Sequence, residues 1–567
     1  MIVGIVGTGP AAAAVEAALT DVEVRADRID VGDVDAVDLA VVVARTGDAV
    51  FERANERAIE AERPWIAAEL GGVGSYPLIE AAIAGLAPSG PCYDCLAGRV
   101  AANRDPDAEA TAAPAAHTVR FAGAVAGRAA ARLVRGADRS ILGTVVEVDG
   151  PRRQLLTLPG CDCSSGVGAE LPREDVTRDL DAALGRAEGG LDERVGIVQD
   201  VGEAESFPVP YYLARSCDTG GFSDATASRD AAGVAAGWDA AFMKALGEAL
   251  ERYCAGVYRT APLETAPPSD LEQAVPPSAF VCESTPGADE ARTWIAGEDL
   301  ATGDDVLLPA ELVLYPPPAE RIRPAITTGL GLGNGGIEAV LAGLSEVIER
   351  DAAMLAWYAT FDPLELTVDD EAFAELVGRA RSEGLSVTPL LLTQDVDVPV
   401  VAACVHRDEW PRFAVGSAAN MDASQAATAA LAEALQNWVE LRGMGPDDAA
   451  EASGRIGYYA DLPDAAAAFI DVDAAVPAAS VGPAEPPTGA EAMEELLDRL
   501  AMADLSAYAA RLTTRDVDSL GFEAVRVLVP AAQPLFFGDP YFGERARSVP
   551  ASLGFDHAPD RPHHPFP

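Results

Sequence analysis

The chain has 567 residues, with 90 acidic residues against 41 basic ones and a formal net charge of −49. An acidic surface of this size repels nucleic acid and anionic membranes, so neither is expected as a partner. The length exceeds what one hydrophobic core holds, and two or three domains are expected.

The basic residues are arginines with one exception, Lys244, and the acidic excess is typical of a protein adapted to a high-salt cytoplasm. The N-terminal residues lack the basic and apolar regions of a signal peptide, and no run reaches the ~18 apolar residues of a membrane span. Eight cysteines are too few for a secreted disulfide scaffold. The sequence therefore predicts a cytoplasmic protein.

Residues 1–190 have the pattern of a Rossmann-like α/β unit. An apolar N-terminal strand leads through a glycine turn at Gly7 and Gly9 into an alanine-rich helix, which is G-x-G-x-x-A geometry. Further strands are predicted at 22–24, 39–43 and 64–68. The acidic residue that should close the second strand is ambiguous, since Asp27 and Asp30 both qualify. We therefore expect a structural turn without a cofactor.

Two close cysteine pairs lie in the same unit, Cys92 with Cys95 and Cys161 with Cys163. A loop and a helix over 117–135 separate the pairs. Four thiolates brought together make a tetrahedral site that suits Zn²⁺, and a site filled by protein ligands is structural. The alternative is four unrelated buried cysteines.

A hydrophilic stretch at 173–194 separates this unit from a second one, 195–567. After two strands, a long helix is expected over 231–259. It carries Glu248, Glu251 and Arg252 at spacings of three and four, which place them on one face.

Residues 327–351 begin with five glycines and continue as an apolar-periodic helix. A glycine-rich start leaves backbone N–H groups free to approach an anion at a helix N-terminus. The helix carries Glu338, Glu346, Glu349 and Arg350. We expect a phosphate-binding element here.

The two helices share one design, K-A-L-G-E-A-L-E-R at 244–252 and A-G-L-S-E-V-I-E-R at 342–350. Either one alone is typical of a surface helix with a Glu–Arg pair. Together, glutamates set among apolar residues indicate clustered carboxylates, whose repulsion a divalent cation relieves. Two such helices facing each other would hold Mg²⁺ and leave arginine for phosphate.

Residues 360–445 read as mixed α/β, and a helix over 424–442 carries Glu433, Gln436 and Arg442. The acidic, alanine-rich stretch 446–492 is predicted to be a surface insertion. A helix over 494–512 and a buried strand over 524–530 follow, and 557–567 is a proline-rich tail.

The ordered motifs G-E-A-L-E-R-Y and G-x-G-N-G-G-I-E-A-V-L-A-G-L-S-E-V-I-E-R-D, with the proline-terminated tail, resemble the YcaO superfamily over 195–567. The first unit, with P-C-x-x-C-L-x-x-R and a later C-x-C, is similar to the ThiF-like zinc domain fused ahead of YcaO in azoline-forming cyclodehydratases. The resemblance implies α/β and α+β folds, namely a Rossmann-type ThiF-like domain followed by a YcaO α+β domain.

The resemblance further implies an enzyme that uses ATP and Mg²⁺ to phosphorylate a peptide-bond oxygen. A Cys, Ser or Thr side chain attacks the preceding amide carbon, and loss of phosphate leaves an azoline. By motif match, the implied Mg²⁺ ligands are Glu248, Glu251, Glu338, Glu346 and Glu349, and the implied nucleotide contacts are Arg252, Asn334 and Arg350, with Gln436 and Arg442 near the phosphates. The implied catalytic residues are Glu346, Glu349, Arg350 and the region of Pro567.

The sequence departs from the family pattern at three places. The common G-K-G is Gly233-Val234-Ala235, and the Q-x-R of the third helix is Gln436-Asn437-Trp438. The chain begins on the Rossmann-like strand without a leader-binding module. We therefore expect a peptide or protein substrate whose leader is recognised by a separate leader-binding partner, or a substrate that is not a leader peptide; a homodimer is the other assembly to consider.

Three alternatives stay open. Thioamide formation from external sulfide, with a sulfur-delivery partner, would use a similar ATP site. A non-catalytic peptide-binding scaffold has no reason to retain five buried glutamates. Adenylation by the first unit would need a nucleotide loop with arginine and aspartate partners, which the sequence does not show.

Overall fold

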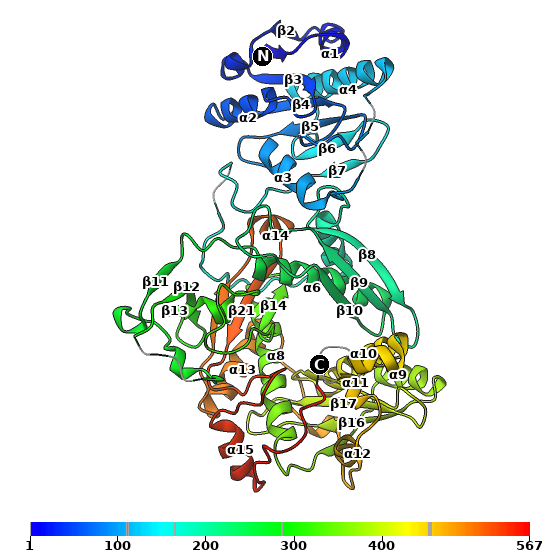
Figure 1. Ribbon diagram of the computed structural model, residues 1–567, viewed down its shortest axis with the longest axis vertical. Coiled ribbons are helices and arrows are strands. Elements are labelled where there is room, and N and C mark those ends of the chain that lie inside the picture. The colour runs from blue at the N-terminus through cyan, green and yellow to red at the C-terminus, as the bar shows by residue number, and fades with distance from the viewer. Residues whose placement is uncertain are drawn as a thin grey trace.

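The computed structural model describes residues 2–566 except 109, 112, 164–165, 285–286, 288 and 452–455, and Pro567 lies outside the described residues. Helices and strands alternate through the chain, which confirms the predicted mixture of α/β and α+β architecture. Figure 1 shows the N-terminal sheet with its helices at one end of an elongated molecule and three further sheets beneath it.

The first sheet has seven strands in the order β2-β1-β3-β4-β5-β6-β7. Its first four strands in this order are parallel and the others antiparallel. The strands are β1 (Ile2–Val6), β2 (Arg25–Arg28), β3 (Leu39–Arg45), β4 (Trp65–Leu70), β5 (Ala81–Leu86), β6 (Thr144–Glu147) and β7 (Arg152–Gln154). The second strand thus begins three residues after the predicted start.

Two layers of helices cover this sheet. Helices α1 (Pro10–Thr20) and α4 (Ala116–Val134) share a core with Val41 and Val43, whereas α2 (Val50–Glu60) and α3 (Tyr93–Asn103) pack against the opposite face. Alternating side chains on β3 supply both cores, as strand geometry requires. The result is a three-layer Rossmann-like arrangement.

A three-stranded antiparallel sheet follows, in the order β10-β9-β8, with β8 (Val198–Glu205), β9 (Tyr211–Ser216) and β10 (Asp230–Val234). Helix α6 (Trp238–Gly256) packs against it. The predicted helix over 231–259 is therefore wrong at both ends. Its first residues form β10, which pairs with β9 and packs through Gly233 against the α6 backbone, and helix α6 ends at Gly256.

Helix α8 (Gly336–Trp357) packs on a six-stranded sheet. Its order is β11-β12-β20-β21-β14, and β13 pairs with β12. The strands are β11 (Glu264–Ala266), β12 (Arg292–Asp299), β13 (Asp305–Pro309), β14 (Leu330–Gly333), β20 (Tyr508–Arg511) and β21 (Glu523–Leu528).

The last sheet has five strands in the order β18-β17-β16-β15-β19. Helix α10 (Ala423–Glu451) packs on β17 and β18. The strands are β15 (Leu364–Thr367), β16 (Ser386–Leu391), β17 (Val400–His406), β18 (Phe413–Ala419) and β19 (Ala475–Pro477). The smaller helices around these sheets are α5 (Leu180–Ala187), α7 (Ala310–Val313), α9 (Glu371–Ser382), α11 (Ile456–Tyr459), α12 (Asp464–Ile470), α13 (Gly489–Met502), α14 (Arg515–Leu520) and α15 (Arg545–Leu553).

The predicted surface insertion 446–492 contributes to the packing in the parts that the structure describes, 446–451 and 456–492. Strand β19 adds to the sheet edge beside β15, and Tyr459 and Phe469 are buried in the main core. Burying two aromatic rings makes this stretch part of the packed domain despite its acidic composition.

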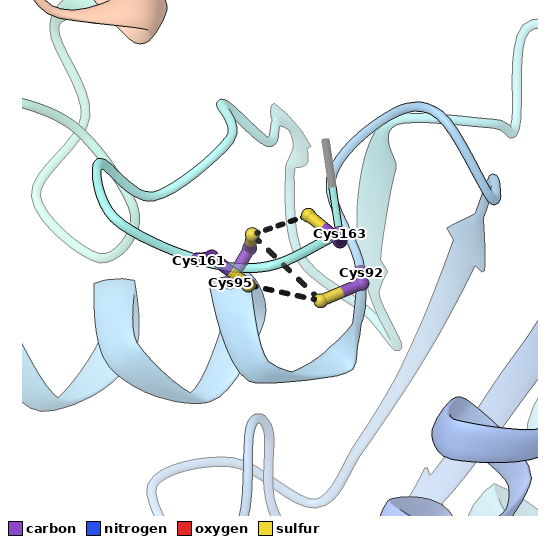
Figure 2. Close-up of side chains that lie close together, drawn as sticks. All are labelled: Cys92, Cys95, Cys161 and Cys163. Carbon is purple, nitrogen blue, oxygen red and sulfur yellow. Dashed lines mark hydrogen bonds between the residues drawn. The ribbon is translucent and has the colours of Figure 1, made fainter. Parts of the chain in front are cut away.

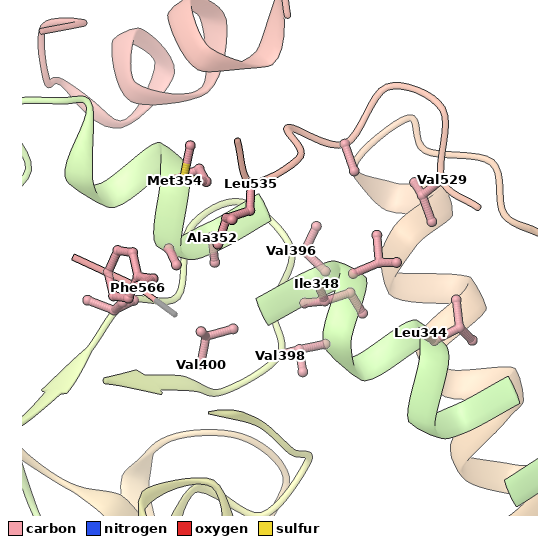
Figure 3. Close-up of a cluster of buried hydrophobic side chains, with 14 of the residues drawn as sticks. Leu344, Ile348, Ala352, Met354, Val396, Val398, Val400, Val529, Leu535 and Phe566 are labelled. Atoms are coloured by element: carbon pink, nitrogen blue, oxygen red, sulfur yellow. The ribbon is translucent and has the colours of Figure 1, made fainter. Parts of the chain in front are cut away.

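The C-terminal half of α8 runs through that same core. Figure 3 shows Leu344, Ile348 and Ala352 of α8 in this core with valines of other segments, and Phe566 of the tail on the side of Ala352. This packing fixes the helix on which the glutamates lie. Among the described helices, none combines the length and apolar character that crossing a membrane requires.

Candidate functional site

The four cysteines come together, as Figure 2 shows. The Sγ atoms of Cys92 and Cys95 are 3.8 Å apart, that of Cys92 is 3.6 Å from Cys161, and that of Cys95 is 3.6 Å from Cys163. All four sulfurs lie within 4.8 Å of one another. Tetrahedral thiolates at the usual zinc–sulfur distance are separated by about 3.8 Å.

These cysteines fit a metal ion by their chemistry as well. Three of the four are buried, and hydrogen bonds within the cluster lower the pKa of the Cys92 and Cys161 thiols and raise that of Cys95 and Cys163. The cluster spans α3 and the loop after β7, so a bound ion would join segments 66 or more residues apart. Zinc at this site stays a proposal.

The second cluster lies between α6 and α8. Glu251 of α6 is half-buried, and desolvation followed by the charge of Glu346 of α8 raises its pKa to about 8. The carboxylate of Glu248 accepts hydrogen bonds from the Ala232 N–H at 2.9 Å and from Arg252 at 2.7 Å. Glu346 accepts one from the N–H of Gly329 at 3.0 Å. Carboxylates of α6 and α8 thus lie close enough for the charge of Glu346 to raise the pKa of Glu251.

Helix α10 contributes a third set of groups. Glu349 accepts a hydrogen bond from the Ser417 hydroxyl at 2.7 Å, and Glu433 accepts one from the Ser417 N–H at 2.7 Å. Arg350 lies between them, 3.4 Å from Glu349 and 3.9 Å from Glu433. Burial raises the pKa of Glu349 to about 8, against the lowering effect of Arg350.

Two arginines complete the charge pattern. Arg526 of β21 is buried, and burial, reinforced by Arg323, lowers its pKa to about 9 although Glu346 and Glu251 oppose this. The Nε atoms of Arg252 and Arg526 are buried without a hydrogen-bond partner in the described part of the chain. Carboxylates held partly protonated beside unsatisfied arginine donors fit a polyphosphate with divalent cations.

Lys244, the one lysine, lies one turn before Glu248 and lines a cavity of about 250 Å³ together with Gln425 and Thr428 of α10. Lys244 is exposed, and desolvation lowers its pKa while the charge of Glu433 opposes this. A solvent-accessible cavity therefore adjoins the carboxylate cluster.

Three of the predicted contact residues, Glu338, Asn334 and Arg442, lie apart from this cluster. Glu338 is exposed and accepts hydrogen bonds from Asn334, and eight residues of helix, about 12 Å, separate it from Glu346. Arg442 pairs with Glu205 at 2.8 Å and with Glu383 at 3.5 Å. Its guanidinium is therefore already engaged. Gln436 lies closer to the cluster. It donates a hydrogen bond to Glu440, which also accepts one from the Tyr211 hydroxyl. Burial, the charge of Glu440 and the charge of Glu248 raise the pKa of Tyr211, which places this group near Glu248.

The glycine run before α8 packs closely against neighbouring backbone. A side chain at Gly331 would lie 2.2 Å from the Ala339 carbonyl oxygen, and one at Gly336 would lie 1.8 Å from that of Pro172. The connector before α5 thus covers the start of α8. Arg178 of the same connector donates to the Asn334 carbonyl at 2.8 Å.

The tail approaches the cluster up to the last described residue. The Trp357 indole N–H at the end of α8 donates to the Pro562 carbonyl at 2.8 Å, and Phe566 packs against the Trp357 ring. Burial, His563 and, more weakly, Arg350 lower the pKa of His564, to about 3. The predicted role of Pro567 lies outside the described residues.

Glu433 and Arg526 were missed as site residues. The helix sequence A-L-A-E-A-L-Q repeats A-L-G-E-A-L-E, with Glu433 at the position of Glu248, so the internal echo extends to a third helix. An arginine within the apolar strand sequence A-V-R-V-L-V was the other available signal.

The glycine turn of the first unit borders a cavity of about 820 Å³ whose lining includes Gly7, Thr8, Arg28 and Asp30. Arg28 donates to the Gly7 carbonyl at 2.9 Å. The expectation that no cofactor binds there stays a prediction.

Comparison with known proteins gives a family match. The family described as YcaO cyclodehydratase, ATP- and Mg²⁺-binding, matches residues 232–533. A protein of Methanothermobacter thermautotrophicus, itself uncharacterized, is 33% identical over 204 residues, covering 34% of this chain and 53% of that protein. An uncharacterized protein in the tfuA 3′ region of Rhizobium leguminosarum bv. trifolii is 30% identical over 161 residues, or 25% and 38% of the two lengths. The chain thus spans about half or less of these relatives.

Solved structures match nearly the whole chain. A heterocyclase in complex with substrate and cofactor superposes with a TM-score of 0.74 at 20% identity, covering 98% of this chain and 83% of that one. The heterocyclase TruD superposes with a TM-score of 0.66 at 18% identity, covering 98% and 82%. At these identities the likeness establishes the shared fold.

Proposed function

Because the chain belongs to the YcaO cyclodehydratase family, we propose that it uses ATP and Mg²⁺ to activate a backbone amide of a peptide, forming azolines from Cys, Ser or Thr. The observation that carries this proposal is the cluster of carboxylates and arginines contributed by α6, α8 and α10. It offers anionic ligands for cations beside donors for phosphate oxygens.

In this proposal Glu248, Glu251, Glu346 and Glu349 hold Mg²⁺, and Glu433 joins them. Bound Mg²⁺ would neutralise phosphate charge during phosphoryl transfer. Arg252, Arg350 and Arg526 would orient the phosphate oxygens, because their guanidinium groups already lie among the carboxylates. Such fixed charges stabilise charge that develops in the transition state.

The proposed reaction takes place at the amide group that precedes the Cys, Ser or Thr residue. The side-chain nucleophile gives up its proton as it attacks the preceding carbonyl carbon, and the oxygen takes the terminal phosphoryl group of ATP, which releases ADP. The C–O bond then breaks with loss of phosphate, and the nitrogen gives up its proton as the C=N bond of the azoline forms.

We propose the four cysteines as a structural zinc site of an N-terminal unit, 1–190, and residues 195–567 as the catalytic unit. The sulfur geometry supports the first part. A separate protein that delivers the peptide belongs to the same proposal.

The test uses Cys-, Ser- and Thr-containing peptides with ATP and Mg²⁺, read by mass spectrometry. Loss of one water with matching ATP hydrolysis is expected. Exchange of oxygen for sulfur in the presence of sulfide would indicate the thioamide reaction instead. ATP binding that is independent of Mg²⁺ would contradict the assignment of the carboxylates.

A further inference from the structure

A fully buried triad of side chains links the four-cysteine site to α6. Arg99 lies one turn after Cys95 on α3, and Asp516 lies in α14, with both side chains 0% exposed. Arg99 donates to the Asp516 carboxylate. The Tyr253 hydroxyl of α6 donates to the same oxygen at 2.7 Å, and Arg99 lies 3.3 Å from that hydroxyl. In Figure 1, α14 lies between the N-terminal unit and α6.

A second set of contacts ties Asp516 to the cysteine loop. Arg515, its neighbour, donates to the Leu158 carbonyl at 2.7 Å and to the Cys161 carbonyl. The Leu158 N–H in turn donates to the Cys95 sulfur at 3.2 Å. The loop conformation that presents the thiols therefore also fixes the start of α14.

The triad reaches the proposed ATP site through α6. Tyr253 directly follows Arg252 and lies two residues after Glu251. Its ring is buried with Leu250 in a core that also contains Cys92 and Cys95. Helical periodicity fixes the angle between Tyr253 and Arg252, so a rotation of α6 about its axis moves both residues together. Any shift of the triad thus changes where Arg252 and the carboxylates point.

We propose that Arg99, Tyr253 and Asp516 are positioning residues, which couple metal binding at the four cysteines to nucleotide binding between α6 and α8. The identity of the two ligands rests on the proposed function. Such coupling is reciprocal, because each ligand then favours the same placement of α6.

The test compares Tyr253→Phe with Tyr258→Phe in the full chain. The first removes the triad hydroxyl and keeps the ring. The control removes a hydroxyl that donates to the Pro316 carbonyl at 2.7 Å, outside the triad. Zinc content and the Kd of a non-hydrolysable ATP analogue with Mg²⁺ are measured before and after chelation.

In the wild type and the control, zinc removal is expected to weaken analogue binding about fivefold or more, within the usual range of allosteric coupling. In Tyr253→Phe the zinc content stays unchanged, the loaded protein binds the analogue about threefold or more weakly than wild type, and chelation changes the Kd less than about twofold. The same response to chelation in both variants would overturn the proposal.

Hydrogen exchange of the α6 amides separates this proposal from the proposed function, since it needs no nucleotide. Zinc-loaded Tyr253→Phe is expected to exchange these amides faster than zinc-loaded Tyr258→Phe. Equal exchange would refute the triad as a positioning device even if the protein binds ATP. A wild type that binds no ATP analogue, with faster α6 exchange in Tyr253→Phe, would refute the nucleotide assignment and leave the link between the cysteine site and α6 intact.

Discussion

Binding of ATP with Mg²⁺ near pH 7 is expected to release protons from the carboxylate cluster. The pKa values of Glu251 and Glu349 are raised from 4.5 to about 8, in each case chiefly by burial. An acid with a pKa of about 8 is about 90% protonated at pH 7, so the two side chains together hold about 1.8 protons. Metal ligation requires the ionised form, and restoring ordinary pKa values corresponds to about 5 kcal/mol for each group.

The assay is titration calorimetry with a non-hydrolysable ATP analogue and excess Mg²⁺, in buffers of different ionisation enthalpy. About two protons should be released at pH 7 and about 0.2 at pH 9. Glu349→Gln should release about one at pH 7. Glu338→Gln, which alters an exposed carboxylate of the same helix, should release as many as the wild type. Release below about half a proton at pH 7 would refute the reasoning.

The same groups set the pH dependence of the unliganded protein. Because their pKa is higher in the folded state, the native protein binds more protons than the unfolded chain. Their contribution is fully present below about pH 4.5 and is lost as the pH rises to about 8. The melting temperature of the unliganded protein should therefore fall as the pH rises from about 4.5 to about 8, and it should fall less in Glu349→Gln.

Three further outcomes are expected. Glu346→Gln should lower ATP turnover about a hundredfold or more with an unchanged circular dichroism spectrum, because the cluster loses a central charge; full activity would contradict its role. Cys92→Ser should lose zinc and lower the melting temperature, since structural zinc sites contribute on the order of 10 kcal/mol, and unchanged metal content would disprove the site. Arg252→Ala should raise the KM for ATP about tenfold, whereas Arg442→Ala, already paired with Glu205, should change it less than about twofold; equal effects would reverse this assignment.

The sequence predicted the elements that depend on local patterns. The Rossmann-like start, the four cysteines and the two E-x-x-E-R helices were all recognisable, because turns, ligand spacing and helical periodicity are set by residues close together in the chain. The family resemblance rests on the same short motifs and is confirmed by the family match over 232–533.

Tertiary structure decided which of these groups meet. Glu433 joins Glu349 through Ser417, and Arg526 reaches the cluster from β21, which follows α8 in the chain only after several other helices and strands, so no local pattern could show either contact. Arg442 has the right residue type but is neutralised elsewhere. The glycine run before α8 has a role that only close backbone packing reveals. Helix periodicity fixes the face on which a side chain lies, whereas the fold alone determines what that face opposes.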